Sequence, residues 1–134
     1  MFEGLISFWH SIVHFSTLEV IFYALLSSLV GVVMGALPGL TATMSLALMT
    51  TLTIKLPHDQ ALLILVCTYV GAIYGGSRSA ILLNIPGTPA SAASCLDGYA
   101  RARQGLAGRA MGIATSGSVL GTLIGMFFLA GFTP

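Results

Sequence analysis

Residues 81–99, ILLNIPGTPASAASCLDGY, begin as an apolar run typical of a membrane helix and then break at Pro86-Gly87. Small and hydroxyl-bearing residues follow, before the chain reaches Asp97. Proline inside a helix removes a backbone hydrogen bond and clashes with the preceding turn, so we expect no continuous helix here. In hydrocarbon, a broken helix persists only where it is buried in protein or lines a wet cavity. The break therefore predicts a membrane protein in which this segment has a function.

The composition of the whole chain supports a membrane protein. The chain has 134 residues, of which 56% are hydrophobic and 7% charged, and its mean hydropathy is +0.97. Soluble domains carry roughly 25% charged residues. No charged residue lies between Glu19 and Lys55 or after Arg109, and such gaps are long enough for the roughly 17 to 25 apolar residues of a membrane span. We therefore expect an all-α integral membrane protein, with residues 1–134 forming a single multi-span helical bundle.

The apolar residues form blocks, at positions 20–54, 60–77, 79–96 and 110–134. The first block is too long for one span and divides at Pro38-Gly39, which predicts a break or a tight reversal. The piece after this break is short for a full crossing and fits a re-entrant segment. The bundle is therefore expected to contain helices interrupted by Pro-Gly.

Glycines recur at fourfold spacing in several of these blocks. On a helix this spacing gathers small residues on one face, so that a second helix can approach closely. The pattern predicts a compact bundle or association with other chains. The glycines are Gly31, Gly35 and Gly39, then Gly71 and Gly75, then Gly117, Gly121 and Gly125.

The run Gly75-Gly76-Ser77 reads as a turn, so we expect residues 60–96 to enter the membrane and return. The basic residues on either side are Lys55 and the cluster Arg101, Arg103 and Arg109. A returning segment places both on one face, which the positive-inside tendency makes cytoplasmic.

The first 19 residues contain no Lys or Arg, so they lack the basic region of a secretory signal peptide. Their aromatic and polar residues suit an amphipathic segment at the level of the lipid headgroups. Residues 1–19 are therefore predicted to form an interfacial N-terminus. The side of the membrane on which it lies stays open.

Several classes of function find no support. A net charge of +1 provides no basic surface for nucleic acid. Cys67 and Cys95 lie in apolar stretches without metal-ligand spacing and read as buried thiols. The carboxylates are scattered without pairing, and no catalytic motif is present. We expect neither an enzyme nor a metal or organic cofactor.

The two breaks have similar sequences, PGLTATMS from residue 38 and PGTPASAAS from residue 86. A helix that restarts after Pro-Gly has unpaired N–H groups at its positive dipole end, which attract carboxylates. Interrupted apolar segments in corresponding positions are also typical of transporter sites. The predicted substrate-binding residues are Pro38, Gly39, Thr41, Thr43, Asn84, Pro86, Gly87, Thr88 and Ser91. Alternatively, the hydroxyls cap their own helices or bond to their own turn.

Two charged residues are further candidates for a substrate or coupling role. Arg78 lies in a long apolar context, where ionisable residues are functional candidates, and its guanidinium suits a carboxylate. Alternatively, it lies at the tip of a loop and reaches water. Asp97 opens the basic region, where it binds a coupling ion or, alternatively, pairs with Arg101 or caps a turn.

The chain resembles a known family in two stretches. These are GVVMGALPGLTATMSLAL, residues 31–48, and YVGAIYGGSRSAILLNIPGTPASAASCLDGYARARQGLAGRA, residues 69–110. They are similar to the start of the large membrane subunit of tripartite tricarboxylate transporters, the TctA family. Members of that family are several times longer, so the chain resembles their N-terminal portion.

This resemblance implies a bacterial inner-membrane secondary transporter that imports tricarboxylates or related organic carboxylates. It further implies a periplasmic solute-binding protein that delivers the substrate, a small membrane subunit, and a coupling cation, Na⁺ or H⁺. The alternative is a membrane scaffold that transports nothing and packs through its glycine faces.

Overall fold

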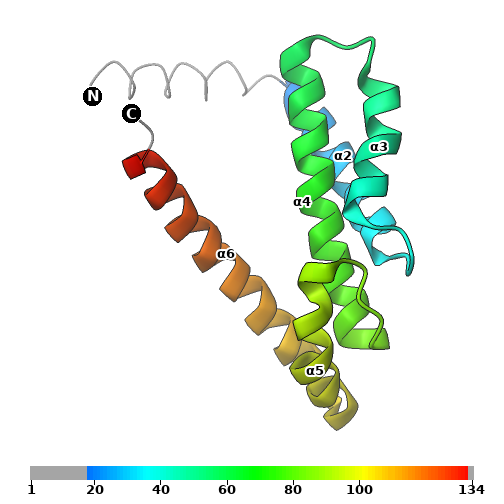
Figure 1. Cartoon of the computed structure of the whole chain (residues 1–134), viewed down its shortest axis with the longest axis vertical. Coiled ribbons are helices and arrows are strands. Elements are labelled where there is room, and N and C mark those ends of the chain that lie inside the picture. Colours follow the sequence, from blue (N-terminus) through cyan, green and yellow to red (C-terminus); the bar gives the residue numbers. More distant parts are fainter. Residues whose placement is uncertain (1–17, 133–134) are drawn as a thin grey trace.

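The computed structural model describes residues 18–132 and shows helices joined by short turns, with no strand in this part of the chain (Figure 1). The helices are α2 (Leu18–Ala36), α3 (Ala42–Thr53), α4 (His58–Leu83), the 3₁₀ turn η1 (Pro89–Ser91), α5 (Ala92–Arg101), the π-helical turn η2 (Ala102–Leu106) and α6 (Ala107–Phe132). The prediction of an all-helical chain is confirmed. The predicted interfacial N-terminus falls almost wholly on residues 1–17, outside the described part.

Three segments are long and apolar enough to cross a membrane: Leu18–Ala36, His58–Leu83 and Ala92–Leu129. With 26 residues, α4 is about 39 Å long, which exceeds a hydrocarbon core of roughly 30 Å. In contrast, α3 has 12 residues and a length of about 18 Å. A crossing of the full membrane is therefore within reach of α4 but not of α3.

Helices α2 and α3 form a hairpin beside α4. Along the contact between α2 and α4, Gly31 lies against Thr68 and Gly35 against Ala72, so these two helices run in the same direction. Helix α3 runs back, toward the end at which α2 and α4 begin (Figure 1). The predicted break at Pro38-Gly39 is confirmed, because it separates α2 from α3.

The predicted turn at Gly75-Gly76-Ser77 is wrong, because α4 continues through it to Leu83. Two adjacent glycines disfavour a helix by about 1 kcal/mol each relative to alanine. Here both are buried: a Cβ on Gly75 would meet the carbonyl oxygen of Val32, and one on Gly76 would lie 3.3 Å from the backbone nitrogen of Thr88. Close packing on two sides therefore explains glycines within a continuous helix.

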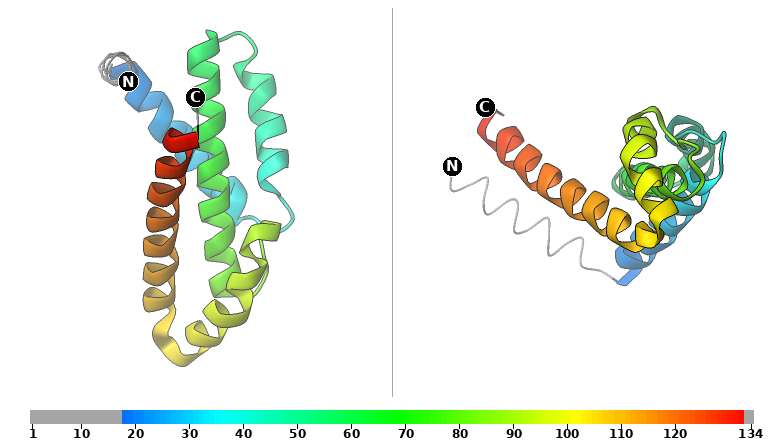
Figure 2. Two further views of the ribbon diagram at one scale, coloured as in Figure 1. Left: turned by 60° about the vertical axis from the view of Figure 1, so that its left-hand side comes forward. Right: turned by 90° about the horizontal axis from the view of Figure 1, so that it is seen from below.

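This continuity also overturns the prediction that Lys55 and the arginine cluster share one face. Lys55 lies in the turn before α4, whereas Arg101, Arg103 and Arg109 lie around η2, at the opposite end of α4 (Figure 1). At η2 the chain reverses through Gly105, whose φ of 80° suits glycine. Helix α6 then rises and diverges from α4 (Figure 2).

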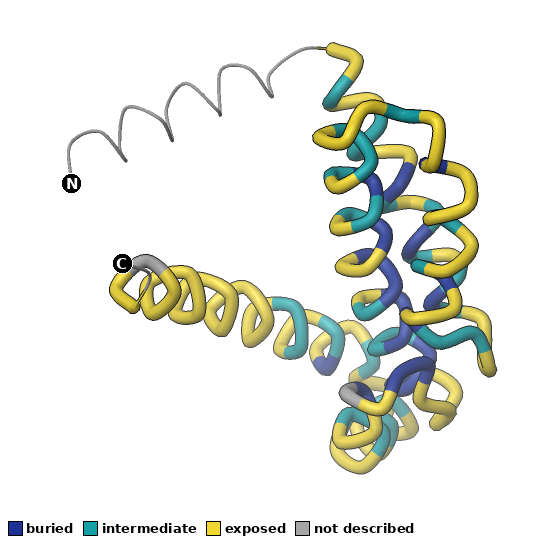
Figure 3. Tube along the Cα trace, turned by 45° about the horizontal axis from the view of Figure 1, so that its top comes forward, coloured by how far each residue is buried: buried dark blue, intermediate teal, exposed yellow. Residues whose placement is uncertain are grey.

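The buried residues are mostly small and lie along α4 and the elements against it, whereas α6 is largely exposed (Figure 3). The carbonyl of Ser27 in α2 faces the Thr68 hydroxyl of α4 at 3.4 Å. Small residues let helix backbones approach closely and are typical of helix contacts in membranes. The predicted packing role is confirmed for Gly31, Gly35, Gly71 and Gly75, whereas the remaining predicted glycines, Gly39, Gly117, Gly121 and Gly125, have nothing within 4 Å of an ideal Cβ.

We predict that Gly75→Ala destabilises the protein and that Gly117→Ala does not. The added methyl group of Gly75→Ala meets the backbone of Val32, and overpacking of this kind costs about 1 to 3 kcal/mol. The same change at Gly117 meets open space and adds helix propensity. We expect the melting temperature of the purified protein to fall by about 5 °C or more for Gly75→Ala and to stay level or rise for Gly117→Ala. Equal melting temperatures for the two variants would contradict the close contact.

Candidate functional site

The second Pro-Gly break packs against α4 and against the last turn of α2, just before the first break. An ideal Cβ on Gly87 would lie 2.5 Å from the carbonyl oxygen of Gly35 and 2.7 Å from the Cα of Gly76. Because Gly35 stands one residue before the end of α2, the second break touches the chain just before the first. The structure thus brings together two segments that lie about fifty positions apart in the sequence.

The second break begins where α4 ends. Asn84 has a φ of 57° and a ψ of 26°, and its N–H donates to the carbonyl of Ala80 over 3.2 Å. This left-handed conformation terminates many helices and is tolerated by asparagine. The chain then returns along α4 until Thr88 lies beside Gly76. The predicted ligand residue Asn84 is thus exposed and serves as the cap of α4.

Thr88 and Ser91 are buried and hydrogen-bonded to each other. The Ser91 hydroxyl donates to the carbonyl of Thr88 over 2.8 Å and accepts from the Thr88 N–H over 3.1 Å and from the Thr88 hydroxyl over 3.3 Å. These bonds satisfy backbone groups at the start of η1. For both residues, the structure shows the capping role that the sequence left as the alternative.

Capping also occupies part of the first break. Thr41 is the N-cap of α3, and its hydroxyl accepts from the N–H of Met44 over 3.3 Å. The hydroxyls of Thr41 and Thr43 lie 2.8 Å apart. The N–H groups of Ala42 and Thr43, however, donate to no acceptor within residues 18–132. These amides stand at the positive end of the α3 dipole, which favours an anion.

The turn before α3 has a defined geometry. In Leu37-Pro38-Gly39-Leu40 the N–H of Leu40 donates to the carbonyl of Leu37 over 3.2 Å, and Gly39 has a φ of 97°. Proline followed by a glycine with positive φ matches a type II β-turn. Pro38 and Gly39 are exposed, as is Pro86 in the other break. These three residues shape the backbone and offer no side-chain donor.

Arg78 lies within α4, so the alternative that placed it at a loop tip is wrong. Its Nη1 donates to the carbonyl of Met111 over 3.1 Å, and its Nη2 donates to the hydroxyl of Thr115. Both partners belong to α6. Asp97 is exposed on α5 and lines a separate groove together with Arg101. Neither charged side chain lies among the residues of the two breaks.

Three residues near the breaks are not predicted as site residues from the sequence pattern. Gly35 and Gly76 form the floor against which Gly87 rests, and Ala42 contributes a free amide. The fourfold glycine spacing predicts the packing role of Gly35, but the doublet Gly75-Gly76 by itself favours a turn. Within residues 18–132 no three His, Cys, Asp or Glu side chains gather as metal ligands.

Comparison with known proteins identifies the family of the chain. Residues 21–134 match the Tripartite tricarboxylate transporter TctA family. The chain belongs to the TctA family. This confirms the resemblance read from the sequence.

An uncharacterized 52.8 kDa protein of Agrobacterium vitis, from the TAR-I ttuC′ 3′ region, is 39% identical to this TctA-family chain over 106 residues. The match covers 79% of the chain and 21% of that protein, so the chain spans about a fifth of the relative's length. No solved structure matches the chain.

We predict that Ser91→Ala destabilises the second break. The change leaves the buried N–H of Thr88 without its acceptor, and an unsatisfied buried donor costs about 1 to 3 kcal/mol. The matched control is Ser94→Ala, since Ser94 is half-buried on α5. Thermal unfolding of the purified variants should show a lower midpoint for Ser91→Ala alone. Identical midpoints would show that this cap does not hold the break.

Proposed function

We propose that this chain is part of the large membrane subunit of a secondary transporter that imports tricarboxylates or related organic carboxylates across the bacterial inner membrane. Membership of the TctA family supports a role in transport. The observation that carries the site is the contact of Gly87 with Gly35 and Gly76, because it places both interrupted segments at one level of α4.

The hydrogen-bond donors of this proposed site come mainly from the main chain. The N–H groups of Ala42 and Thr43 are free within the described chain, and the α3 dipole adds partial positive charge at that end. A carboxylate oxygen accepts such N–H bonds directly, and the exposed Thr43 hydroxyl adds a further donor. The negative charge of a substrate is thereby stabilised without a buried Lys or Arg. Thr88 and Ser91 contribute by holding the second break in shape.

The proposed membrane topology follows from α4. If α4 crosses the membrane, the α2–α3 hairpin enters from the Lys55 end, and the segment Asn84–Arg101 enters from the arginine end (Figure 1). Both tips then lie within the membrane as re-entrant segments. The positive-inside tendency makes the arginine end cytoplasmic and the start of α2 periplasmic. Broken helices that meet between two aqueous sides are typical of secondary transporters.

Partners are proposed from the family. They are a periplasmic solute-binding protein, a small membrane subunit and a coupling cation, Na⁺ or H⁺. Because the chain spans 21% of its relative's length, we assign the complete transport cycle to the intact transporter. Alternating access requires a second element that moves against the site.

The competing candidate is a scaffold that transports nothing. The observation in its favour is that the buried glycines and several hydroxyls already have structural partners. A ligand that binds the folded state stabilises it. Citrate-like anions should therefore raise the melting temperature of the intact transporter, whereas a scaffold would show no shift.

We predict that Thr43→Val in the intact transporter raises the KM for carboxylate uptake about tenfold, which corresponds to one lost hydrogen bond of about 1.4 kcal/mol. Thr50→Val is the matched control, since Thr50 lies seven residues farther along α3 and its hydroxyl donates to Leu46. Uptake of labelled substrate by whole cells measures both variants. A KM unchanged in Thr43→Val, or raised equally in Thr50→Val, would remove Thr43 from the site.

Substitution of Gly87 by valine would not be a clear test of the proposed carboxylate site. A Cβ at residue 87 meets the backbone of Gly35 and Gly76, so loss of uptake would follow from disturbed packing as well as from a damaged site. Thr43 is exposed, and its substitution by a residue of similar shape leaves the packing in place.

A further inference from the structure

The positive charge of Arg78 has neutral surroundings. The guanidinium donates to the Met111 carbonyl and the Thr115 hydroxyl, and it lies over the ring of Tyr74, 4.0 Å from the centroid. Arg78 stands five residues before the end of α4, about 8 Å along the helix axis. Charges inside membrane helices are costly and pair with one another or with backbone carbonyls.

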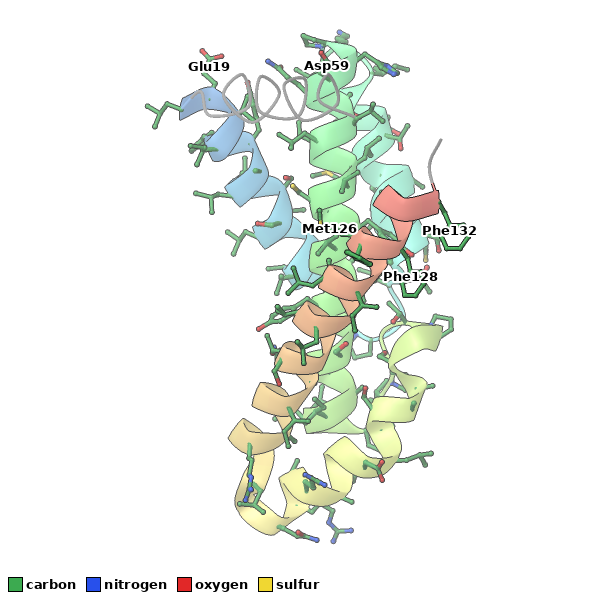
Figure 4. All side chains as sticks on the ribbon, turned by 90° about the vertical axis from the view of Figure 1, so that its left-hand side faces the viewer. Glu19, Asp59, Met126, Phe128 and Phe132 are labelled. Atoms are coloured by element: carbon green, nitrogen blue, oxygen red, sulfur yellow. The ribbon has the colours of Figure 1, made fainter. Side chains whose placement is uncertain are left out.

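No carboxylate within residues 18–132 neutralises Arg78. Glu19 and Asp59 lie at the far end of the molecule, beside the start of α2 and α4 (Figure 4). Asp97 lines a different groove, between α4, α5 and the start of α6. The described chain thus holds a half-buried arginine whose partners are a carbonyl, a hydroxyl and an aromatic ring, with no carboxylate among them.

Arg78 lies in a groove between α4 and α6 with a volume of about 440 Å³. Each wall extends over about two helical turns, residues 70–78 of α4 and 114–122 of α6. The α6 wall consists of small and hydroxyl-bearing residues, Ala114, Thr115, Ser118, Gly121 and Thr122. Such residues let another helix approach closely and hydrogen-bond across the contact.

The α6 wall of the groove is largely exposed. None of the most apolar part of the Ala92–Leu129 span is buried, and α6 diverges from α4 toward its C-terminal end (Figure 2). In the Agrobacterium vitis relative, the matching region is about a fifth of the protein's length. The intact transporter therefore has further chain from which a covering helix can come.

We propose that the α4–α6 groove is the docking site of a further transmembrane helix of the intact transporter, and that an Asp or Glu of this helix pairs with Arg78. The small wall residues set a close approach, and the charge pair sets the depth of the incoming helix. The pair also removes the cost of a lone charge at this depth. This docking site is separate from the proposed substrate site and does not depend on which solute is carried.

Charge balance favours a helix over a free organic acid as the occupant. A tricarboxylate carries up to three negative charges, whereas Arg78 is the cation among the residues that line the groove. Its two terminal nitrogens already donate to α6. The α4 wall combines the apolar residues Val70 and Ile73 with Tyr74 and Ser77. A helix that carries one carboxylate matches the single positive charge of this groove.

The first test compares arginine substitutions in the intact transporter. We expect Arg78→Gln to lower the amount of folded transporter in the membrane several-fold, because the partner carboxylate is then left alone. Arg78→Lys should retain most of the folded protein. The control Arg103→Gln removes an exposed arginine and should leave the amount unchanged. Wild-type levels for Arg78→Gln would overturn the proposal, as would a raised KM for uptake with unchanged folding, which would make Arg78 a substrate ligand.

The second test identifies the partner. Arg78→Glu is combined with random mutagenesis and selection by a folding reporter fused to the C-terminus, a readout that requires no transport. We expect restoring changes that replace an Asp or Glu beyond residue 134, in a transmembrane helix, by Lys, Arg or a neutral residue. Restoring changes confined to residues 1–134 would overturn the proposal and would indicate an internal partner or a second copy of this chain.

Discussion

The close contact between the backbones of α2 and α4 is the constraint on which the rest of the structure depends. Gly31 and Gly35 lie directly against Thr68 and Ala72, and Gly75 lies against Val32. With any larger side chain on this contact, α2 would stand farther from α4. The end of α2 would then no longer reach the level of Gly76, and the turn at Pro38-Gly39 would lie elsewhere.

The position of the second break beside the end of α2 follows from this contact. Gly87 reaches the carbonyl of Gly35 only because α2 lies so close to α4 and because Gly76 has no side chain. Small residues thus have two roles. They let α2 and α4 pack closely, and they leave room for the second break beside these helices. In a lipid environment, where backbone groups need partners, such close packing also makes interrupted helices tolerable.

The hydroxyl residues of the breaks divide into two kinds. Thr88 and Ser91 are buried and bonded to each other, so their part in our proposed site is to hold the loop. Thr43 is exposed, its hydroxyl lies 2.8 Å from that of Thr41, and the N–H groups of Ala42 and Thr43 have no acceptor within residues 18–132. The proposed carboxylate site is therefore built mainly from the main chain, and Arg78, held by α6, belongs to a different contact.

The sequence by itself determined the membrane character, the all-helical class, the two Pro-Gly breaks and the family, because hydropathy, proline stereochemistry and local motifs are properties of short stretches. Only the tertiary structure decided the continuity of α4, the separation of Lys55 from the arginines and the contact of the second break with the end of α2. The reason is physical. A glycine pair such as Gly75-Gly76 is compatible with a turn or with a closely packed helix, and what lies against it in space selects between the two.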